Sequence, residues 1–466
     1  MSLLRNHWSH AWSVRIGPSR MYGVRVKKLL PILMTGLGCS SAQQSGVSVA
    51  PASDTMLPSA AFLAALPDGD AKRAFIGDCT GCHTLREEIA YVNGAPRTHE
   101  SWQEATARML GFAGAHSNFP VISAERDAAS TAKWLAESLP ARSAISWRWR
   151  RDLEQKAEIR TFMLPEAKDL PHDLAIADNR VIVTGMFTAR MYIIDPATGG
   201  VTTEGTPEPN PRAVEIDSQG NWWVVLGGPK KVARRSRDGS WQTFDAGFYA
   251  HSVAIAPDRG VWVNGHFTHA PELLRRIDPM TGAARNVEVP AHPDFKTTPV
   301  PYEVRAASSG EIWLSELLGN RIVRYDPASN QFKHWPMPAR HSAPRRLDVD
   351  PNGIVWIPEY AANRLARFDP RTEQFTEYEL PLKDSAPYVA RWDARRGVVW
   401  IGTGAADALF RFDPRAQRFT YYRLSESDLL VRHLVIDGAS GDIWLAPGAS
   451  PGRAAARVIR VRPLEP

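Results

Sequence analysis

Short apolar runs alternate with polar turns through the last two thirds of the chain, and a tryptophan recurs in each period. Successive tryptophans are separated by 40, 51, 43, 44 and 44 residues, and all but the first follow a turn that contains Gly or Asp. The six are Trp222, Trp262, Trp313, Trp356, Trp400 and Trp444. Four short strands per period of about 44 residues, with one buried aromatic residue each, are typical of a β-propeller.

The number of repeats predicts how the propeller closes. Counting from Leu170 gives seven units, and the last unit lacks its outermost strand after Arg462. Residues 158–165 alternate as that missing strand would, so we predict that they pair with the final blade and leave no free sheet edge. We therefore expect an all-β propeller of about seven blades over residues 158–463.

A different pattern occupies residues 59–140, where helical periodicity surrounds the motif Cys79-Thr80-Gly81-Cys82-His83. C-x-x-C-H is the haem attachment pattern, in which two thiols add to the vinyl groups and the next residue binds the iron. A zinc site would need more Cys and His partners, and a thioredoxin-like pair would need a βαβ context. The motif therefore predicts one covalent haem c on Cys79 and Cys82, with His83 as the proximal iron ligand.

The segments that flank the motif resemble a class I cytochrome c domain, in which the first and last helices pack across each other. A predicted helix leads into Cys79, and a second predicted helix starts at Ser123 and ends near Pro140. Met109 is the only methionine between Cys82 and Pro140, on a predicted helix over residues 101–110. The resemblance implies that Met109 is the distal iron ligand. The alternatives are core packing of Met109, a histidine ligand (His116 or His99), and an open sixth position.

The N-terminal region has the pattern of an export signal. Basic residues precede a short apolar run over residues 29–38, which is far shorter than a membrane-spanning helix. We predict a signal peptide at 1–38 and a flexible tether at 39–58. Gly38-Cys39-Ser40 resembles a bacterial lipoprotein processing site, which implies lipidation of Cys39 and a membrane anchor; an ordinary signal peptide is the alternative. The predicted location is periplasmic or exported, and Met21 is a second candidate for the start.

Charge supports export rather than nucleic-acid binding. The chain has 56 Lys and Arg against 50 Asp and Glu, a net charge of +6. Residues 1–38 contain six of the basic residues and no acidic one, so the mature chain is formally neutral. A nucleic-acid partner is therefore not expected. Residues 141–157, which include Trp147-Arg148-Trp149-Arg150-Arg151, are predicted to link the two domains.

The alignment of the seven repeats predicts a ring of polar side chains at one mouth of the axial channel. The second residue of each innermost strand is never aliphatic. These residues are His172, Arg212, His251, Tyr302, Arg345, Tyr388 and Arg432. Such a ring favours a small anionic or phenolic ligand, or else it bonds to neighbouring loops and excludes water. Glu316 and Glu359 are candidate carboxylates at the same face.

The repeats also resemble a known family. Asn320-Arg321-Ile322-Val323-Arg324-Tyr325-Asp326-Pro327 and the segment 358–364 are similar to the virginiamycin B lyase (streptogramin lyase) family. The resemblance implies a seven-bladed propeller and metal-assisted elimination, with a His base and Glu/His partners near the channel mouth. That family places a Glu two residues before the catalytic His, whereas no Glu-x-His pair occurs at His172, His251 or His433.

Together these patterns predict a multidomain protein, with a small all-α cytochrome c domain followed by the propeller. The expected function is single-electron transfer through the haem to a redox partner protein, with the propeller binding a substrate or that partner. The alternatives are a lyase with an attached cytochrome and a non-catalytic redox adaptor, so whether the chain is an enzyme is left open. A divalent metal held by His172, His251 and His433 is a further prediction for the propeller.

Overall fold

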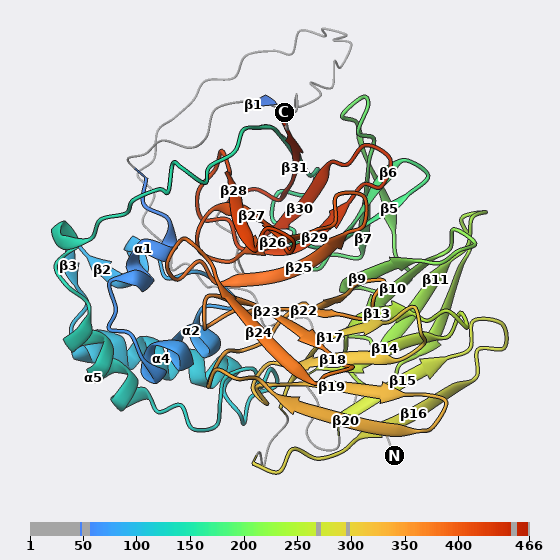
Figure 1. Cartoon of the computed structure of the whole chain (residues 1–466), viewed down its shortest axis with the longest axis horizontal. Helices are drawn as coiled ribbons and strands as arrows, with labels where there is room; N and C mark the ends of the chain where they lie inside the picture. The colour runs from blue at the N-terminus through green and yellow to red at the C-terminus, as the bar shows by residue number, and fades with distance from the viewer. Residues whose placement is uncertain (1–46, 49–55, 267–271, 295–298, 449–453, 465–466) are drawn as a thin grey trace, which may run out of the picture. The chain divides into compact units, whose positions relative to one another are not determined.

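The structure is a computed structural model that describes residues 47–48, 56–266, 272–294, 299–448 and 454–464 (Figure 1). The predicted signal peptide, Cys39 and most of the tether lie outside these residues. Residues 44–466 form one compact unit, so the helical region and the propeller are described together. Within the described residues, no helix combines the length and the apolar character needed to span a bilayer.

The helical region runs from α1 to a short 3₁₀ turn. Its elements are α1 (Ser59–Ala64), α2 (Asp70–Cys79), α3 (Glu87–Ala90), β2 (Tyr91–Val92), β3 (Ala95–Pro96), α4 (His99–Ala113), α5 (Ala128–Ser138) and η1 (Arg142–Ala144). Helix α4 is longer than the predicted 101–110 because Thr98 caps it, accepting a hydrogen bond from the Ser101 amide. Helix α5 begins later than predicted because Asp127 caps it in the same way.

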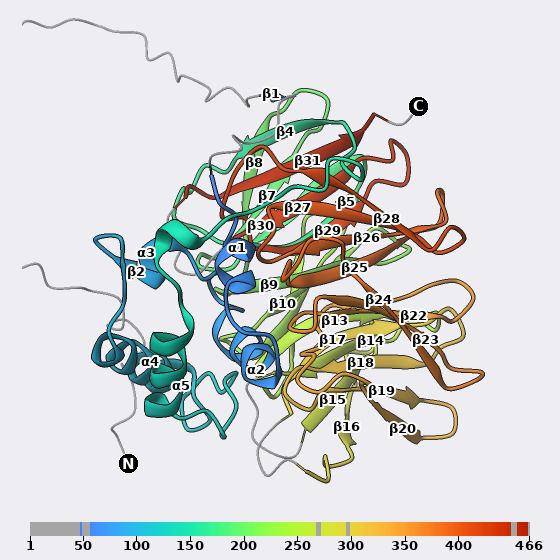
Figure 2. The same cartoon turned by 60° about the vertical axis from the view of Figure 1, so that its left-hand side comes forward.

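Helix α2, which leads into the Cys-x-x-Cys-His motif, contacts the last helix, α5. The ring of Phe75 on α2 lies 5.6 Å from that of Trp134 on α5. Figure 2 shows α2, α4 and α5 gathered beside the propeller. The region is thus mainly helical, with one short two-stranded sheet, and its identity as a cytochrome is taken up below as a proposal.

The described residues of the propeller form seven blades of four antiparallel strands. The first three blades are β5 (Pro171–Ala177), β6 (Arg180–Gly185), β7 (Arg190–Ile194) and β8 (Val201–Gly205); β9 (Pro211–Ile216), β10 (Trp222–Leu226), β11 (Lys231–Arg235) and β12 (Trp241–Asp245); and β13 (Ala250–Ile255), β14 (Val261–Gly265), β15 (Glu272–Ile277) and β16 (Ala284–Val289). Each blade runs from its innermost to its outermost strand in chain order.

The remaining four blades repeat this arrangement. They are β17 (Pro301–Ala306), β18 (Ile312–Glu316), β19 (Arg321–Asp326) and β20 (Gln331–Pro336); β21 (Asp348–Val349), β22 (Val355–Glu359), β23 (Arg364–Asp369) and β24 (Gln374–Glu379); β25 (Pro387–Asp393), β26 (Val398–Thr403), β27 (Ala408–Asp413) and β28 (Arg418–Arg423); and β29 (Val431–Ile436), β30 (Ile443–Pro447), β31 (Arg457–Pro463) and β4 (Ala157–Met163), with β1 (Val47–Ser48) added outside β4.

The predicted closure of the ring is confirmed. Strand β4 pairs antiparallel with β31 over its whole length, with Ile159 opposite Val461 and Met163 opposite Arg457. A strand from the start of the propeller therefore completes the last blade, and the β1 strand covers the edge that β4 would otherwise leave free.

The repeated tryptophans pack between blades, and one of them was predicted one position too early. The fully buried member of the second blade is Trp223, whereas Trp222 is its less buried neighbour. The Trp223 indole donates a hydrogen bond to Asp217, and Trp400 donates in the same way to Asp393. Two adjacent tryptophans in one strand leave the register ambiguous, because they point to opposite faces of the blade: Trp222 packs against the first blade and Trp223 against the third.

A cluster of paired charges occupies the axis of the propeller. We call it the axial cluster; it consists of Asp173, Glu215, Glu303, Arg305, Arg346, Asp348, Arg391 and His433. Arg346 bonds to Asp173 at 2.7 Å and to Glu303 at 3.2 Å, which joins three blades. Glu303 also accepts from Arg391 at 2.8 Å. The cluster links every blade except the third, so these ion pairs hold the blades at their inner edges.

Arg346→Met should destabilise the propeller strongly. The substitution leaves the carboxylates of Asp173 and Glu303 buried with less compensation, and breaking a buried pair in this way costs about 3–5 kcal/mol. Urea unfolding followed by tryptophan fluorescence measures the change. Arg371→Ala is the control, because its side chain is 77% exposed beside Asp369 and its loss should leave the urea midpoint unchanged. Equal midpoints for the two variants would contradict the structural role of the cluster.

Candidate functional site

The seven ring residues predicted from the repeat converge at one mouth of the channel. Six innermost strands begin one residue before the ring residue, and the pairing with the second strand shifts in register near that point. Such bulges redirect a side chain out of the sheet, here toward the axis. The ring residue Arg345 precedes the short strand β21 and lies in a segment held by isolated bridges at Pro344 and Arg346. All seven side chains are buried.

One half of the ring is a connected group of arginines and tyrosines. Arg345 donates to the Tyr302 hydroxyl at 3.0 Å, and Arg432 donates to the Tyr388 hydroxyl at 3.1 Å. The Tyr302 and Tyr388 hydroxyls are hydrogen-bonded to each other. The Arg345 guanidinium also lies over the Tyr360 ring, 4.0 Å from its centroid. We call Tyr302, Arg345, Tyr360, Tyr388 and Arg432 the Arg–Tyr group.

The two central tyrosines differ in acidity. Burial and the neighbouring Tyr388 raise the pKa of Tyr302. Burial acts in the same sense on Tyr388, but the positive charges of Arg432, Arg345 and Arg346 outweigh it and lower the pKa of that phenol. Tyr388 is therefore the more acidic member of the hydrogen-bonded pair.

The other half of the ring consists of Arg212 and the imidazoles of His172 and His251, whose rings meet edge to face. The His251 ring lies 4.6 Å from the Tyr302 ring and 5.8 Å from that of His172. The Nδ1 atom of His172 contacts Asp173 and the Arg212 carbonyl. Burial lowers the pKa of His172 to about 3, so this imidazole is neutral at physiological pH. Arg212 donates to the Tyr249 hydroxyl at 2.7 Å.

The Cys-x-x-Cys-His turn lies directly against the Arg–Tyr group. Arg432 donates to the carbonyl oxygens of Cys82 and Gly81, at 2.8 and 3.2 Å. The Tyr360 hydroxyl donates to the Thr80 carbonyl at 2.9 Å. The mouth of the channel is thus covered on this side by residues 80–82 of the same chain, a contact that spans about 350 residues of sequence.

Ion pairs on both sides of the turn fix the helical region to the propeller. Lys72 on α2 is buried and binds Asp384 at 2.5 Å. On the other side, Thr84 and Arg86 both bind the carboxylate of Asp428. The docked turn is thus held from below and at each flank.

The cysteines and the histidine of the motif lie at the end of α2 and in the following turn. Cys79 is half-buried, Cys82 is exposed, and the two thiols are not joined in a disulfide. The Nδ1 atom of His83 lies 3.3 Å from the Thr84 carbonyl oxygen. Burial lowers the pKa of His83. Met109 lies on α4 with 40% of its surface exposed, next to Phe112 with 50% exposed.

Glu316 and Glu359 lie opposite Pro301 and Pro344, at the same end of the blades as the ring, but they are not exposed at an open mouth. Both are fully buried, because the second strands that carry them are enclosed by their neighbours. Glu316 binds Arg321 at 2.5 Å. Burial and the neighbouring Glu377 raise the pKa of Glu359 well above its usual value. Among the described residues, no group of three or more His, Cys, Asp or Glu side chains is arranged to hold a metal ion, and this includes the three predicted histidines.

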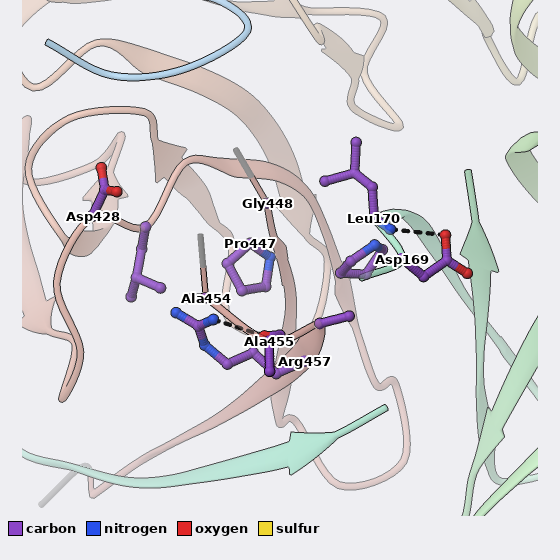
Figure 3. A pocket seen from close by; sticks show the side chains of 11 residues that line it. Asp169, Leu170, Asp428, Pro447, Gly448, Ala454, Ala455 and Arg457 are labelled. Atoms are coloured by element: carbon purple, nitrogen blue, oxygen red, sulfur yellow. Dashed lines mark hydrogen bonds between the residues drawn. The ribbon is translucent and has the colours of Figure 1, made fainter. Parts of the chain in front are cut away.

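A small cavity lies beside the docked turn, between the seventh and first blades (Figure 3). Asp428, which anchors the motif, and Gly448, whose carbonyl accepts from Arg432 at 2.6 Å, line one side. Asp169 on the other side is engaged by the hydroxyl groups of Tyr192 and Thr188. The polar side chains of this cavity are thus committed to structural hydrogen bonds, and we place the functional site at the channel mouth.

Three residues of the site were not found from the sequence. Tyr360, Asp384 and Asp428 lie outside the aligned ring position, and each bonds to the helical region. Tyr360 follows directly after strand β22, and the two aspartates lie in loops between blades, at the positive-φ positions 384 and 428. Their position in the loops at one face of the propeller is the only signal that could have suggested a docking role.

Comparison with known proteins supports the propeller. Residues 200–458 match the model of the virginiamycin B lyase family. A virginiamycin B lyase from Staphylococcus aureus shares 18% identity, covering 66% of this chain and 99% of that chain with a TM-score of 0.57. A catalytically inactive form of the enzyme from the same species, solved with quinupristin, shares 17% identity, covering 66% of this chain and 99% of that chain with a TM-score of 0.58. The WD40 propeller of Doa1 shares 12% identity, covering 65% of this chain and 95% of that chain with a TM-score of 0.51. At these identities the solved structures show the fold alone, and no curated protein matches the chain.

Asp407→Asn should remove a pH dependence of stability. Asp407 is buried and accepts from the Leu429 amide at 2.7 Å, and burial raises its pKa to about 7. The unfolded carboxyl has a pKa near 4, so between about pH 4 and pH 7 the folded protein keeps a proton on Asp407 that the unfolded chain releases. The folded protein therefore becomes less stable as the pH rises through that range. The free energy of unfolding falls by about 1.4 kcal/mol for each pH unit in that window.

Urea midpoints at pH 5 and pH 8 measure this effect. The unmodified protein should be less stable at pH 8 by this contribution. Asp407→Asn should show a smaller difference because an amide does not titrate, while its oxygen can still accept from the Leu429 amide. An identical difference in both proteins would show that Asp407 does not titrate in this range.

Gly81→Ala should loosen the docking of the turn. A methyl group at this position would overlap the Arg345 guanidinium, which cannot easily move because it packs on three tyrosine rings. We expect hydrogen exchange of α2 amides to increase about tenfold, equivalent to about 1.4 kcal/mol. Gly111→Ala is the matched control, since an added methyl group meets nothing within 4 Å. Unchanged exchange in Gly81→Ala would rule out the close contact.

Proposed function

This chain belongs to the virginiamycin B lyase family, and we propose that its propeller is a rigid platform for a haem-bearing, electron-transferring helical region. One observation carries the proposal: the Cys-x-x-Cys-His turn is held over the channel mouth by Arg432 and Tyr360. A free depsipeptide-sized substrate would need that space. The family's propeller would thus serve here to position the turn.

The residues of the motif fit a covalent haem. Two unpaired thiols lie three positions apart, one half-buried and one exposed. The His83 Nδ1 atom faces a backbone carbonyl, an arrangement that directs Nε2 to a metal. The exposed Met109 and Phe112 on α4 offer an apolar surface that a large flat group would cover.

Each residue has a definite task in this proposal. Cys79 and Cys82 hold the haem covalently, His83 is its proximal ligand, and Met109 is its distal ligand. The haem supplies one-electron transfer when bound. Arg432 and Tyr360 hold the backbone between the cysteines at the propeller, and the flanking Lys72–Asp384 pair prevents α2 from swinging away.

The same proposal covers location and partners. We place the protein in the periplasm or outside the cell, because c-type haem is attached after export, and we propose a lipid anchor on Cys39. A redox partner protein would exchange electrons with the haem. Because the docking uses the propeller's mouth, that partner would approach the helical region from its free side.

Elimination of a cyclic depsipeptide is the second candidate, favoured by the family match and by the histidines at the mouth. The relative solved with quinupristin is a lyase. In this chain His172 and His251 are buried members of the ring, and the Glu-x-His pair of the family is missing. A lyase function would therefore require the helical region to leave the mouth.

Expression in a periplasm that contains the haem attachment machinery tests the proposal. The protein should carry one haem that remains bound after denaturation and shows the sharp α-band of a reduced c-type cytochrome. Cys79→Ala combined with Cys82→Ala should abolish attachment. Met109→Ala should keep the covalent haem but lose the methionine–iron absorption band, while Met280→Ala, an exposed methionine on the propeller, should change nothing.

A colourless protein under these conditions would sink the electron-transfer proposal. Quinupristin with Mg²⁺ then tests the second candidate, on the full chain and on Gly81→Ala. Linearisation of quinupristin that is independent of haem and faster in Gly81→Ala would establish the lyase. Absence of turnover by a haem-loaded protein supports the first proposal.

A further inference from the structure

Two buried arginines at the docked turn lack a carboxylate partner. Arg345 is 3% exposed and Arg432 is 6% exposed. In the described part of the chain, no carboxylate lies within ion-pair distance of either guanidinium; their acceptors are tyrosine hydroxyls and the carbonyls of Gly81, Cys82 and Gly448. Their charges are thus solvated only by neutral groups and aromatic faces.

The neighbouring arginines of the axial cluster show the contrast. Arg346, the next residue after Arg345, binds Asp173 and Glu303. Arg391 also binds Glu303. The described residues therefore pair Arg346 and Arg391 in the channel with carboxylates, whereas Arg345 and Arg432 at the mouth have no carboxylate partner. Ionisation of Tyr388 would compensate one of the two mouth charges at most, so a net positive charge remains beside the turn.

The unpaired charges lie against the haem attachment site itself. Arg432 bonds to the carbonyls of two successive residues between the thioether positions. Arg345 approaches Gly81 so closely that a methyl group there would overlap its guanidinium. A buried charge acts through a low dielectric and is weakly screened by salt, so its effect on a neighbouring redox group is large.

We propose that Arg345 and Arg432 of the propeller raise the reduction potential of the haem held by residues 79–83. This inference rests on the proposed function. The ferric form carries one more positive charge than the ferrous form, so nearby cations destabilise the ferric form more. One electron is gained and no bond is made or broken. The propeller is then part of the redox centre, because removing it would change the electron affinity of the iron.

Potentiometric titration of the haem-loaded full chain tests the role of charge. Arg432→Gln and Arg345→Gln should each shift the ferric/ferrous ratio toward ferric by about tenfold at a fixed potential, which is about 59 mV for one electron. Arg212→Gln is the matched control, because Arg212 belongs to the same ring but bonds to Tyr249 instead of the turn. It should shift the ratio much less.

Arg432→Lys separates charge from docking. Lysine keeps the positive charge but cannot make the two-carbonyl contact, so the potential should stay close to that of the unmodified protein. Equal shifts in Arg432→Lys and Arg432→Gln would show that loss of geometry, not of charge, is responsible and would overturn the inference. Unchanged potentials in Arg345→Gln and Arg432→Gln would overturn it too. If those variants still show the spectrum of a c-type haem, the proposed function stands although this inference fails. A protein without haem would overturn both.

Discussion

A buried guanidinium group must find acceptors, and this constraint organises both the propeller and its docked helical region. At the axis, Arg346 and Arg391 meet carboxylates contributed by other blades, so the inner strands are joined by charge as well as by packing. At the mouth, Arg345 and Arg432 meet tyrosines and backbone carbonyls instead. The helical region supplies two of those carbonyls, so its position is a consequence of how the propeller solvates its own charges.

Periodicity decided what could be predicted from the sequence. Seven repeats, six of them marked by a tryptophan, predicted the fold, the closing strand and the register of the ring, because each is a repeated local pattern. The adjacent Trp222 and Trp223 show the limit of this reasoning, since alternation alone does not select between them. The helix ends depended on the caps Thr98 and Asp127, which are weak signals in a single sequence.

The docking could not be predicted, because it depends on single contacts between distant residues. Lys72 and Asp384, or Gly81 and Arg432, lie roughly 300 residues or more apart and belong to no shared repeat. The Arg345-Arg346 doublet illustrates the difficulty. Two identical neighbouring residues serve different purposes, because one side chain points to the mouth and the other into the axial cluster. Only the three-dimensional arrangement distinguishes them.

The closing pair β4–β31 has a consequence for the order in which the protein matures. Residues 157–163 pair with residues 457–463, so the ring cannot close until nearly the whole chain has been synthesised. Arg432 and Asp428 belong to the same late segment. The turn that carries Cys79 and Cys82 is therefore made earlier and stays uncovered until the propeller closes, so its thiols are accessible during that interval, as the proposed haem attachment would require.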